Sequence, residues 1–236
     1  LPLRRIMSAA PKLIYFGFRG RALASRVALF NALGKDGWVD ERVSLPRFKK
    51  EAKQEQNPER LDAPYITNNL PQLNLPCGTK FSQSHAIARY AARLPPAPEA
   101  AAASHHTPDL YPSGKSSLIV DEAIAVVDQI LLLTPKDSDE ATRQAAREAY
   151  QRSGFLRVGM ELLEGRLKQS SGPFLLGSQL SIADLYVRAP LCDLFELKHF
   201  DGVTDDFVAQ FPRVQECGLA VLEHPLLKAY HENYKN

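Results

Sequence analysis

The spacing of apolar residues changes its period once along this chain. Between residues 12 and 93, short apolar runs of strand length alternate with runs of helical spacing, in the order β-α-β-α-β-β-α. From residue 116 to 236 the apolar residues recur at helical spacing alone. Residues 94–115 between them hold five prolines and no sustained apolar period, which is typical of a linker. With residues 1–11 set aside as a leader, we predict a small α/β domain, a linker and an all-helical domain.

The helical half contains its own start signal. Ser181 and Asp184 form a capping pair, because the hydroxyl can satisfy a first-turn N–H while the acid faces the positive end of the helix. Leu180 and Leu185 stand at the spacing of a hydrophobic staple. The other helices are expected at residues 117–133, 139–169, 204–222 and 224–232.

Composition and charge exclude several classes of function. The 236 residues are 44% hydrophobic and 24% charged, which is ordinary for a soluble globular protein. A net charge of +2 is too small to indicate a nucleic-acid partner or an acidic membrane surface. No apolar run approaches the ~20 residues of a membrane span. We therefore expect neither nucleic acid nor a membrane as a partner.

The three cysteines are widely spaced and odd in number. Cys77, Cys192 and Cys217 contain no C-x-x-C pair, which fits a reducing compartment and argues against a disulfide framework or a zinc site. His105 and His106 are adjacent, but a linker is not expected to position further metal ligands around them. No metal site is expected.

Four stretches point to one family. L-I-Y-F-G-F-R-G-R-A, N-L-P-Q-L, F-S-Q-S-H-A-I-A-R-Y and G-S-Q-L-S-I-A-D-L-Y resemble the cytosolic glutathione S-transferases. The sequence is most similar to the sigma class, which includes glutathione-dependent prostaglandin D synthases, and the resemblance runs from about residue 12 almost to the end. It implies a thioredoxin-like first domain and an all-helical second domain, a homodimer, and a cytoplasmic role in detoxification. It also implies glutathione as co-substrate, a hydrophobic electrophile as second substrate and no requirement for a metal.

The chemistry needs a thiolate, since a thiol with a pKa of ~8.5 is only a few per cent ionised at pH 7. Lowering that pKa by ~2 units requires ~2.7 kcal/mol of differential stabilisation. A hydrogen bond from an O–H group to the sulfur, with a nearby cation and a helix N-terminus, is of this order. Tyr15 matches the catalytic tyrosine of the family, and Arg21 matches the arginine that supports it. A half-buried strand tyrosine is the competing interpretation of Tyr15, and Arg19 is equally compatible with a solvated turn.

Two further stretches match the glutathione-binding residues of the family. Gln83 and Ser84 match the pair that holds the γ-glutamyl end, where a helix N-terminus and a hydroxyl receive a carboxylate. Ser84 as a simple helix cap is the alternative, and both roles are compatible. Leu70 would offer its backbone N–H and C=O to the cysteinyl unit, next to Pro71, which is cis in the family.

The second helix departs from the sigma pattern. Phe48 takes the place of a tryptophan, so the indole donor toward the glycyl end is absent, and Ala52 takes the place of the lysine. Lys53 is our candidate for the glycyl carboxylate, with Lys49 and Lys50 as neighbours and surface charge as the alternative. The aspartate by which a partner subunit contacts the γ-glutamyl amine would fall at Asp128, although Gln129 takes the strict position.

The identity of the electrophile stays open. Phe16 and Phe18 follow the predicted catalytic tyrosine and are equally compatible with the co-substrate pocket and with the core. Two other functions compete with a conjugating enzyme: a glutathione-dependent isomerase of the prostaglandin D synthase type, and a non-catalytic binding or structural protein with the same fold. Cysteine-based thiol transfer would need a cysteine at position 15 or early in the first helix, and none is there.

Overall fold

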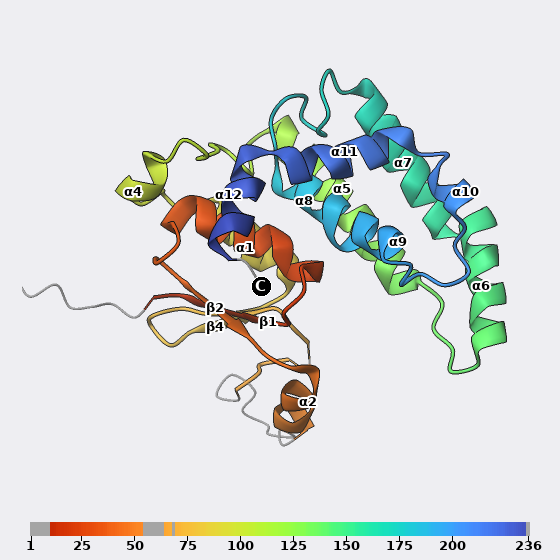
Figure 1. The fold of residues 1–236 in the computed structure, drawn as a ribbon, viewed down its shortest axis with the longest axis horizontal. Coiled ribbons are helices and arrows are strands. Elements are labelled where there is room, and N and C mark those ends of the chain that lie inside the picture. Colours follow the sequence, from red (N-terminus) through yellow and green to blue (C-terminus); the bar gives the residue numbers. More distant parts are fainter. Residues whose placement is uncertain (1–9, 54–63, 68, 235–236) are drawn as a thin grey trace, which may run out of the picture. The chain divides into compact units, whose positions relative to one another are not determined.

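The structure is a computed structural model that describes residues 10–53, 64–67 and 69–234, and it divides into two compact units. The first runs to Ser104 and the second starts at His105, a boundary that falls within the predicted linker. Figure 1 shows the elements of both units. Those of the first unit are β1 (Lys12–Tyr15), the 3-10 turn η1 (Gly20–Ala22), α1 (Leu23–Leu33), β2 (Val39–Arg42), α2 (Leu45–Lys53), β3 (Gln72–Asn74), β4 (Lys80–Ser82), α3 (Ser84–Ala92) and α4 (Pro98–Ala101).

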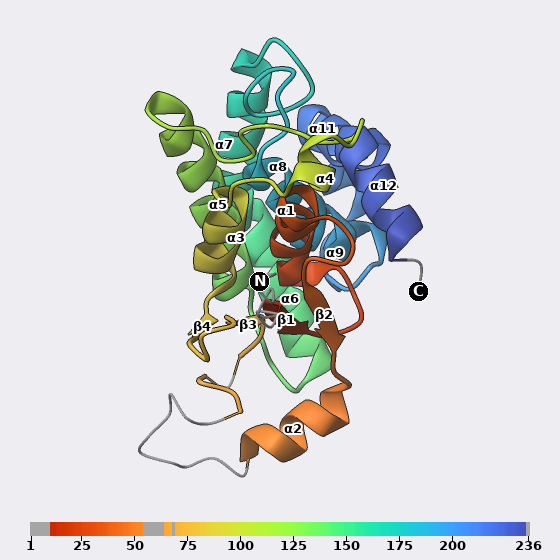
Figure 2. The ribbon, with the colours of Figure 1, turned by 90° about the vertical axis from the view of Figure 1, so that its left-hand side faces the viewer.

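The predicted order β-α-β-α-β-β-α is confirmed, and its strands form one mixed sheet in the order β2-β1-β3-β4. β1 and β2 are parallel because α1 crosses over between them, whereas β3 and β4 are a hairpin antiparallel to β1. α1 and α3 pack together on one face of the sheet, and α2 lies on the opposite side (Figure 1, Figure 2). α4 is a short helix inside the predicted linker, and Pro98 opens it at a position that suits proline.

The second unit is mostly helical, as expected, apart from irregular segments and two isolated β-bridges within residues 174–179. Its elements are α5 (Lys115–Leu133), α6 (Glu140–Ser153), α7 (Phe155–Gln169), α8 (Ile182–Tyr186), the π-helical turn η2 (Val187–Cys192), α9 (Asp193–Glu196), α10 (Asp205–Val208), α11 (Pro212–Glu223) and α12 (Pro225–Asn233). In the part of the chain that the structure describes, no helix is both long and apolar enough to cross a membrane.

Two segments that were predicted as single helices are each divided in the structure. The segment 139–169 is two helices rather than one, because Gly154 adopts an extended conformation between α6 and α7. A Cβ on Gly154 would lie 2.8 Å from the carbonyl oxygen of Tyr150, so the close approach at this corner requires glycine. The segment 204–222 is likewise divided, since Pro212 cannot continue a helix from the residues before it and instead begins α11.

The predicted capping box is present at the start of α8. Asp184 is fully buried, and its carboxylate accepts hydrogen bonds from the backbone N–H of Ser181 at 2.8 Å and from the Ser181 hydroxyl at 2.7 Å. It also accepts from the backbone N–H of Leu175 at 2.8 Å and from the Cys217 thiol at 3.5 Å. Burial raises the pKa of Asp184. One carboxylate thus joins the start of α8 to the preceding loop and to α11.

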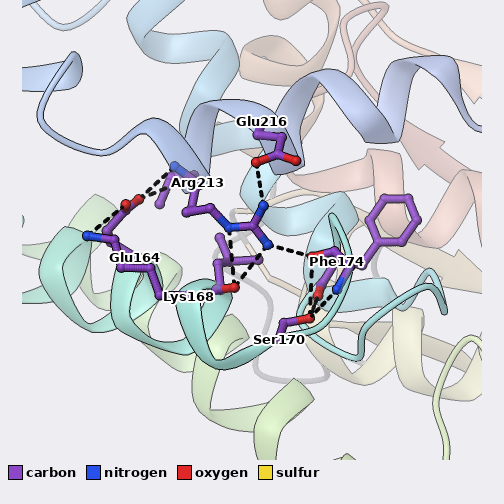
Figure 3. A network of polar contacts seen from close by, with 9 residues as sticks. Glu164, Lys168, Ser170, Phe174, Arg213 and Glu216 are labelled. Carbon is purple, nitrogen blue, oxygen red and sulfur yellow. Dashed lines mark hydrogen bonds and ion pairs between the residues drawn. The ribbon is translucent and has the colours of Figure 1, made fainter.

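A second buried carboxylate supports the start of α11. Glu164 on α7 accepts hydrogen bonds from the backbone N–H groups of Arg213 and Val214 at 3.0 and 3.1 Å, and its other oxygen lies 3.3 Å from Lys168 Nζ (Figure 3). The Arg213 side chain turns back to donate to the carbonyls of Leu167 and Gly172, at the end of α7 and just beyond it. A negative charge at a helix N-terminus is favourable, so Glu164 acts as a cap supplied by another helix.

We expect Glu164→Ala to lower the free energy of unfolding by about 2 kcal/mol or more, because two backbone N–H groups at the start of α11 lose their acceptor. Lys168→Ala is the matched control, since it removes only the exposed partner of Glu164 and should cost less than about 1 kcal/mol. Denaturant titration followed by circular dichroism measures both changes. Equal losses for the two variants would contradict this account of the cap.

Candidate functional site

The strand register brings three predicted site segments to one edge of the sheet. Gln72 of β3 is paired with Ile14 of β1 on one side and with Ser82 of β4 on the other. The next residue along β1 is Tyr15, and the next after β4 is Gln83. Because β3 runs in the opposite direction, the residue before Gln72 belongs to the same edge, and that residue is Pro71. The sheet therefore ends at Tyr15, Pro71 and Gln83 on three neighbouring strands.

Tyr15 is buried, with 5% of its surface exposed, and its phenol lies at the turn that follows β1. The phenol oxygen accepts a hydrogen bond from the backbone N–H of Arg21 at 3.2 Å. Burial raises the pKa of Tyr15, while the Arg21 N–H and the charges of Arg21 and Arg26 oppose that rise. A raised pKa keeps the phenol protonated at neutral pH. Tyr15 can therefore donate its own proton in a hydrogen bond to an anion while it accepts from Arg21.

The turn between Tyr15 and Arg21 depends on one close approach. Gly20 has a positive φ of 40°, and a Cβ there would lie 2.7 Å from both the Tyr15 hydroxyl and the Phe18 ring. The rings of Phe16 and Phe18 stack with their centroids 5.6 Å apart, and each also contacts the Tyr15 ring. Phe16 is half-buried, whereas Phe18 is 60% exposed. Phe18 is therefore an aromatic surface beside the phenol.

The second and third segments offer backbone groups at the same edge. Gln83 precedes α3 with φ 74° and ψ 106°, a conformation that side-chain-bearing residues rarely adopt and that costs about 1–3 kcal/mol. It leaves the N-terminus of α3 and the buried Ser84 beside the sheet edge. The Leu70–Pro71 peptide bond is cis. Among the described residues, none accepts a hydrogen bond from the Leu70 backbone N–H. These groups are suited to an extended peptide-like ligand with a carboxylate at one end.

The α2 side of this unit is built from aromatic packing. Phe48 is buried between Phe16 and Tyr65, with ring centroids 5.6 and 5.0 Å away. The Tyr65 hydroxyl donates to Glu51 at 2.7 Å, and burial together with the Glu51 charge raises the pKa of Tyr65 to about 12. Phe48 therefore contributes packing where the family pattern has an indole donor. The side chain of the predicted Lys53 lies outside the described residues.

Two buried residues at the site were missed from the sequence. Gln72 is fully buried and holds the segment ahead of Pro71, because its amide accepts from Ile66 N–H at 2.9 Å and donates to the Pro64 carbonyl at 2.8 Å. A glutamine in the middle of an apolar strand was the available signal. Arg26 is buried in α1, where its charge stands within an otherwise apolar helical pattern.

The remaining predicted residues lie elsewhere. Asp128 is half-buried and Gln129 is exposed on α5 of the second unit. His105 and His106 lie at the start of the second unit. No group of three or more potential metal ligands occurs within residues 10–53, 64–67 and 69–234.

Comparison with known proteins identifies the fold. A sequence profile described as "Glutathione S-transferase, C-terminal domain" matches residues 130–234. Glutathione S-transferase 3 of Caenorhabditis elegans is 26% identical over 227 residues, which cover 93% of this chain and 94% of that protein. The chain has the glutathione S-transferase fold, and its named relatives support glutathione S-transferase activity.

Two solved structures illustrate the similarity. The first is rat hPGDS complexed with a quinoline, with a TM-score of 0.68 and 20% identity over 96% of this chain and 98% of that one. The second is monomeric Na-GST-3, a glutathione S-transferase from the hookworm Necator americanus, with a TM-score of 0.59 and 22% identity over 97% of this chain and 98% of that one. At these identities the likeness concerns the fold alone.

We expect Gly20→Ala to lower the free energy of unfolding by about 2 kcal/mol, because the new methyl group meets the Tyr15 hydroxyl and the Phe18 ring at a positive φ. Gly17→Ala is the control in the same turn, since its Cβ would meet nothing within 4 Å. It should change stability by less than about 1 kcal/mol in either direction. Denaturant unfolding of both variants tests the difference, and an unchanged Gly20→Ala protein would contradict the close approach.

Proposed function

We propose that this protein is a sigma-like glutathione S-transferase in which Tyr15 stabilises the glutathione thiolate for attack on a hydrophobic electrophile. The observation that carries the proposal is the buried phenol of Tyr15 at the sheet edge that also holds Pro71 and Gln83. In the part of the chain that the structure describes, the Tyr15 hydroxyl makes one hydrogen bond, which it accepts from Arg21, and this supports a proton that is available for the sulfur. Arg21 adds a positive charge close to the same atom.

The required energy is within reach of these groups. A neutral phenol that donates to a thiolate makes a charge-assisted hydrogen bond, which contributes about 1.5–3 kcal/mol. Lowering the thiol pKa by ~2 units needs ~2.7 kcal/mol, so Tyr15 with the Arg21 charge suffices. Holding both reactants in one site then supplies the remaining acceleration through proximity.

Glutathione would lie along the sheet edge in an extended form. Its γ-glutamyl carboxylate would bind at the N-terminus of α3 with Gln83 and Ser84, and its cysteinyl backbone would pair with Leu70 beside Pro71. Phe48 would contribute apolar contact at the glycyl end, with Lys53 as the proposed cation. Phe16 and Phe18 would form one wall for the electrophile, which the exposed ring of Phe18 supports.

We propose that the protein is cytoplasmic, that it acts in detoxification and that its reaction requires no metal. The support is the state of its thiols: Cys77, Cys192 and Cys217 are all free, including the exposed Cys77. A reducing compartment maintains thiols in this form.

The proposed functional form is a homodimer, in which Asp128 would reach the γ-glutamyl amine bound by the partner. An apolar stripe on α5 supports this form. Leu118, Ala125 and Leu132 recur every seven residues on one face of the helix and are exposed, Leu118 by 70%. Exposed leucines at such spacing are typical of a helix that packs on another chain.

Tyr15→Phe should raise the pKa of the bound glutathione thiol by about 2 units, toward its free value, and lower turnover about 50-fold at pH 6.5. Tyr90→Phe is the control, because Tyr90 lies exposed on α3. The thiol pKa follows from the ultraviolet absorbance of the bound thiolate, and turnover from a panel of electrophiles. A Tyr15→Phe enzyme that behaves like Tyr90→Phe would overturn the mechanism. Tight binding without turnover on any electrophile would favour a binding protein.

Leu118→Glu should convert the dimer to a monomer, because a charge would be buried in the proposed interface. Leu219→Glu is the control, since Leu219 is comparably exposed but lies on α11. Light scattering after size-exclusion chromatography gives the mass of each form. A wild-type mass near 26 kDa, that of one chain, would contradict the dimer.

A further inference from the structure

We propose that Arg26, oriented by Asp40, is a positioning residue that fixes the turn after β1 and thereby places the Tyr15 phenol. The inference rests on the proposed function and deepens it. It concerns residues that touch neither glutathione nor the electrophile in the proposed arrangement. Their effect reaches the sulfur only through Tyr15.

The buried Arg26 side chain contacts Asp40, the backbone of the turn after β1 and the Tyr15 ring. It is 2% exposed in α1, and its Nε donates to Asp40 Oδ1 at 3.0 Å. Its Nη1 donates to the carbonyl of Phe18 at 2.7 Å, and its Nη2 to the carbonyl of Phe16 at 2.8 Å. Its Cζ lies 5.5 Å from the centroid of the Tyr15 ring. The guanidinium therefore spans the turn and contacts the catalytic ring.

The turn has few other attachments. Among the described residues, Arg26 is the only donor to the carbonyls of Phe16 and Phe18. The next recorded backbone bonds are those from Val43 to the Tyr15 carbonyl and from Ala22 to the Arg19 carbonyl, on either side of the turn. Arg26 thus determines where the backbone runs between the strand and η1.

Asp40 holds the guanidinium group of Arg26 in one orientation. Its side chain is 5% exposed on β2, and it pairs with Arg26 through one oxygen and with Arg42 through the other, at 3.0 and 2.9 Å. A buried carboxylate held on both sides cannot rotate without losing a charged hydrogen bond. The guanidinium is planar, so fixing Nε also fixes the directions of Nη1 and Nη2. Asp40 therefore aims the two donors at the turn.

The turn is in contact with the reactive group. The Phe18 ring lies 5.4 Å from the Tyr15 ring, and Gly20 leaves no room between Phe18 and the Tyr15 hydroxyl. Movement of the Phe18 backbone would therefore shift the ring that confines the phenol. A small displacement of a catalytic donor is costly because hydrogen-bond strength falls steeply with distance and angle.

The test compares Arg26→Lys with Arg42→Lys. Lysine keeps the charge in both variants, but its single ammonium cannot replace the fork that reaches Asp40, Phe16 and Phe18 together. Arg42→Lys weakens a bond to the same carboxylate without touching the turn. We expect Arg26→Lys to raise the pKa of the bound glutathione thiol by about 1 unit and to lower turnover about fivefold at pH 6.5. Arg42→Lys should change turnover less than about twofold, and the KM for glutathione should stay within about threefold in both.

A double variant distinguishes an effect of Arg26 on the Tyr15 phenol from a general disturbance of the site. Arg26→Lys added to Tyr15→Phe should leave the thiol pKa where Tyr15→Phe alone puts it, because the arginine acts through the phenol. Asp40→Asn replaces Arg26→Lys if that protein does not fold, and it should shift the thiol pKa in the same direction. If Tyr15→Phe itself leaves the thiol pKa unchanged, the proposed function and this inference both fail. If Tyr15→Phe shifts it but Arg26→Lys matches Arg42→Lys, the positioning role alone is overturned.

Discussion

The pairing of Gln72 with both Ile14 and Ser82 is the constraint on which the first unit depends. Side chains alternate along a strand, so a slip of one residue would turn the buried Gln72 and Leu73 each to the opposite face of the sheet. It would also separate Tyr15 from Pro71 and Gln83. Gln72 protects this register in a second way, since its buried amide bonds to the Pro64 carbonyl and to Ile66. A slipped strand would leave that amide buried without partners, which costs about 1–3 kcal/mol.

Local sequence patterns were enough to predict the structure where the conformation of a segment depends on that segment alone. The β-α-β-α-β-β-α order and the capping box of Ser181 and Asp184 are of this kind, and both are present. The break between α6 and α7 at Gly154 could not be predicted in this way, because an isolated glycine is also tolerated inside a helix. Glycine is necessary here only because the backbone closely approaches Tyr150. Arg26 could not be predicted for a similar reason. Its partner Asp40 is fourteen positions away and on another element.

In the α2 region the helix is kept, but it lacks a hydrogen-bond donor that the family pattern has there. Phe48 keeps the bulk and burial expected of an aromatic residue but has no donor. Tyr65, which no sequence motif singles out, packs on Phe48 and donates its hydroxyl proton to Glu51. The aromatic contacts join α2 to the segment before Pro71 by packing and one hydrogen bond. Arg47 on the same helix is paired with both Glu41 and Glu51, so the function that we propose assigns the cation at the glycyl end of glutathione to Lys53 instead.

Burial serves opposite purposes in the two units. Asp184 accepts four hydrogen bonds, which offset part of its desolvation and join the start of α8 to the preceding loop and to α11. Tyr15 is also buried, but within residues 10–53, 64–67 and 69–234 its phenol has one hydrogen-bond partner, the Arg21 N–H, and that bond uses the oxygen as an acceptor. Among these same residues the phenol proton meets no acceptor, and in a place of low polarity a hydrogen bond to an anion is strongest. In the function that we propose, this incomplete satisfaction of a buried phenol is the physical reason that Tyr15 would stabilise a thiolate. The proposed role of the Arg26–Asp40 pair is to hold the turn beside that phenol in place.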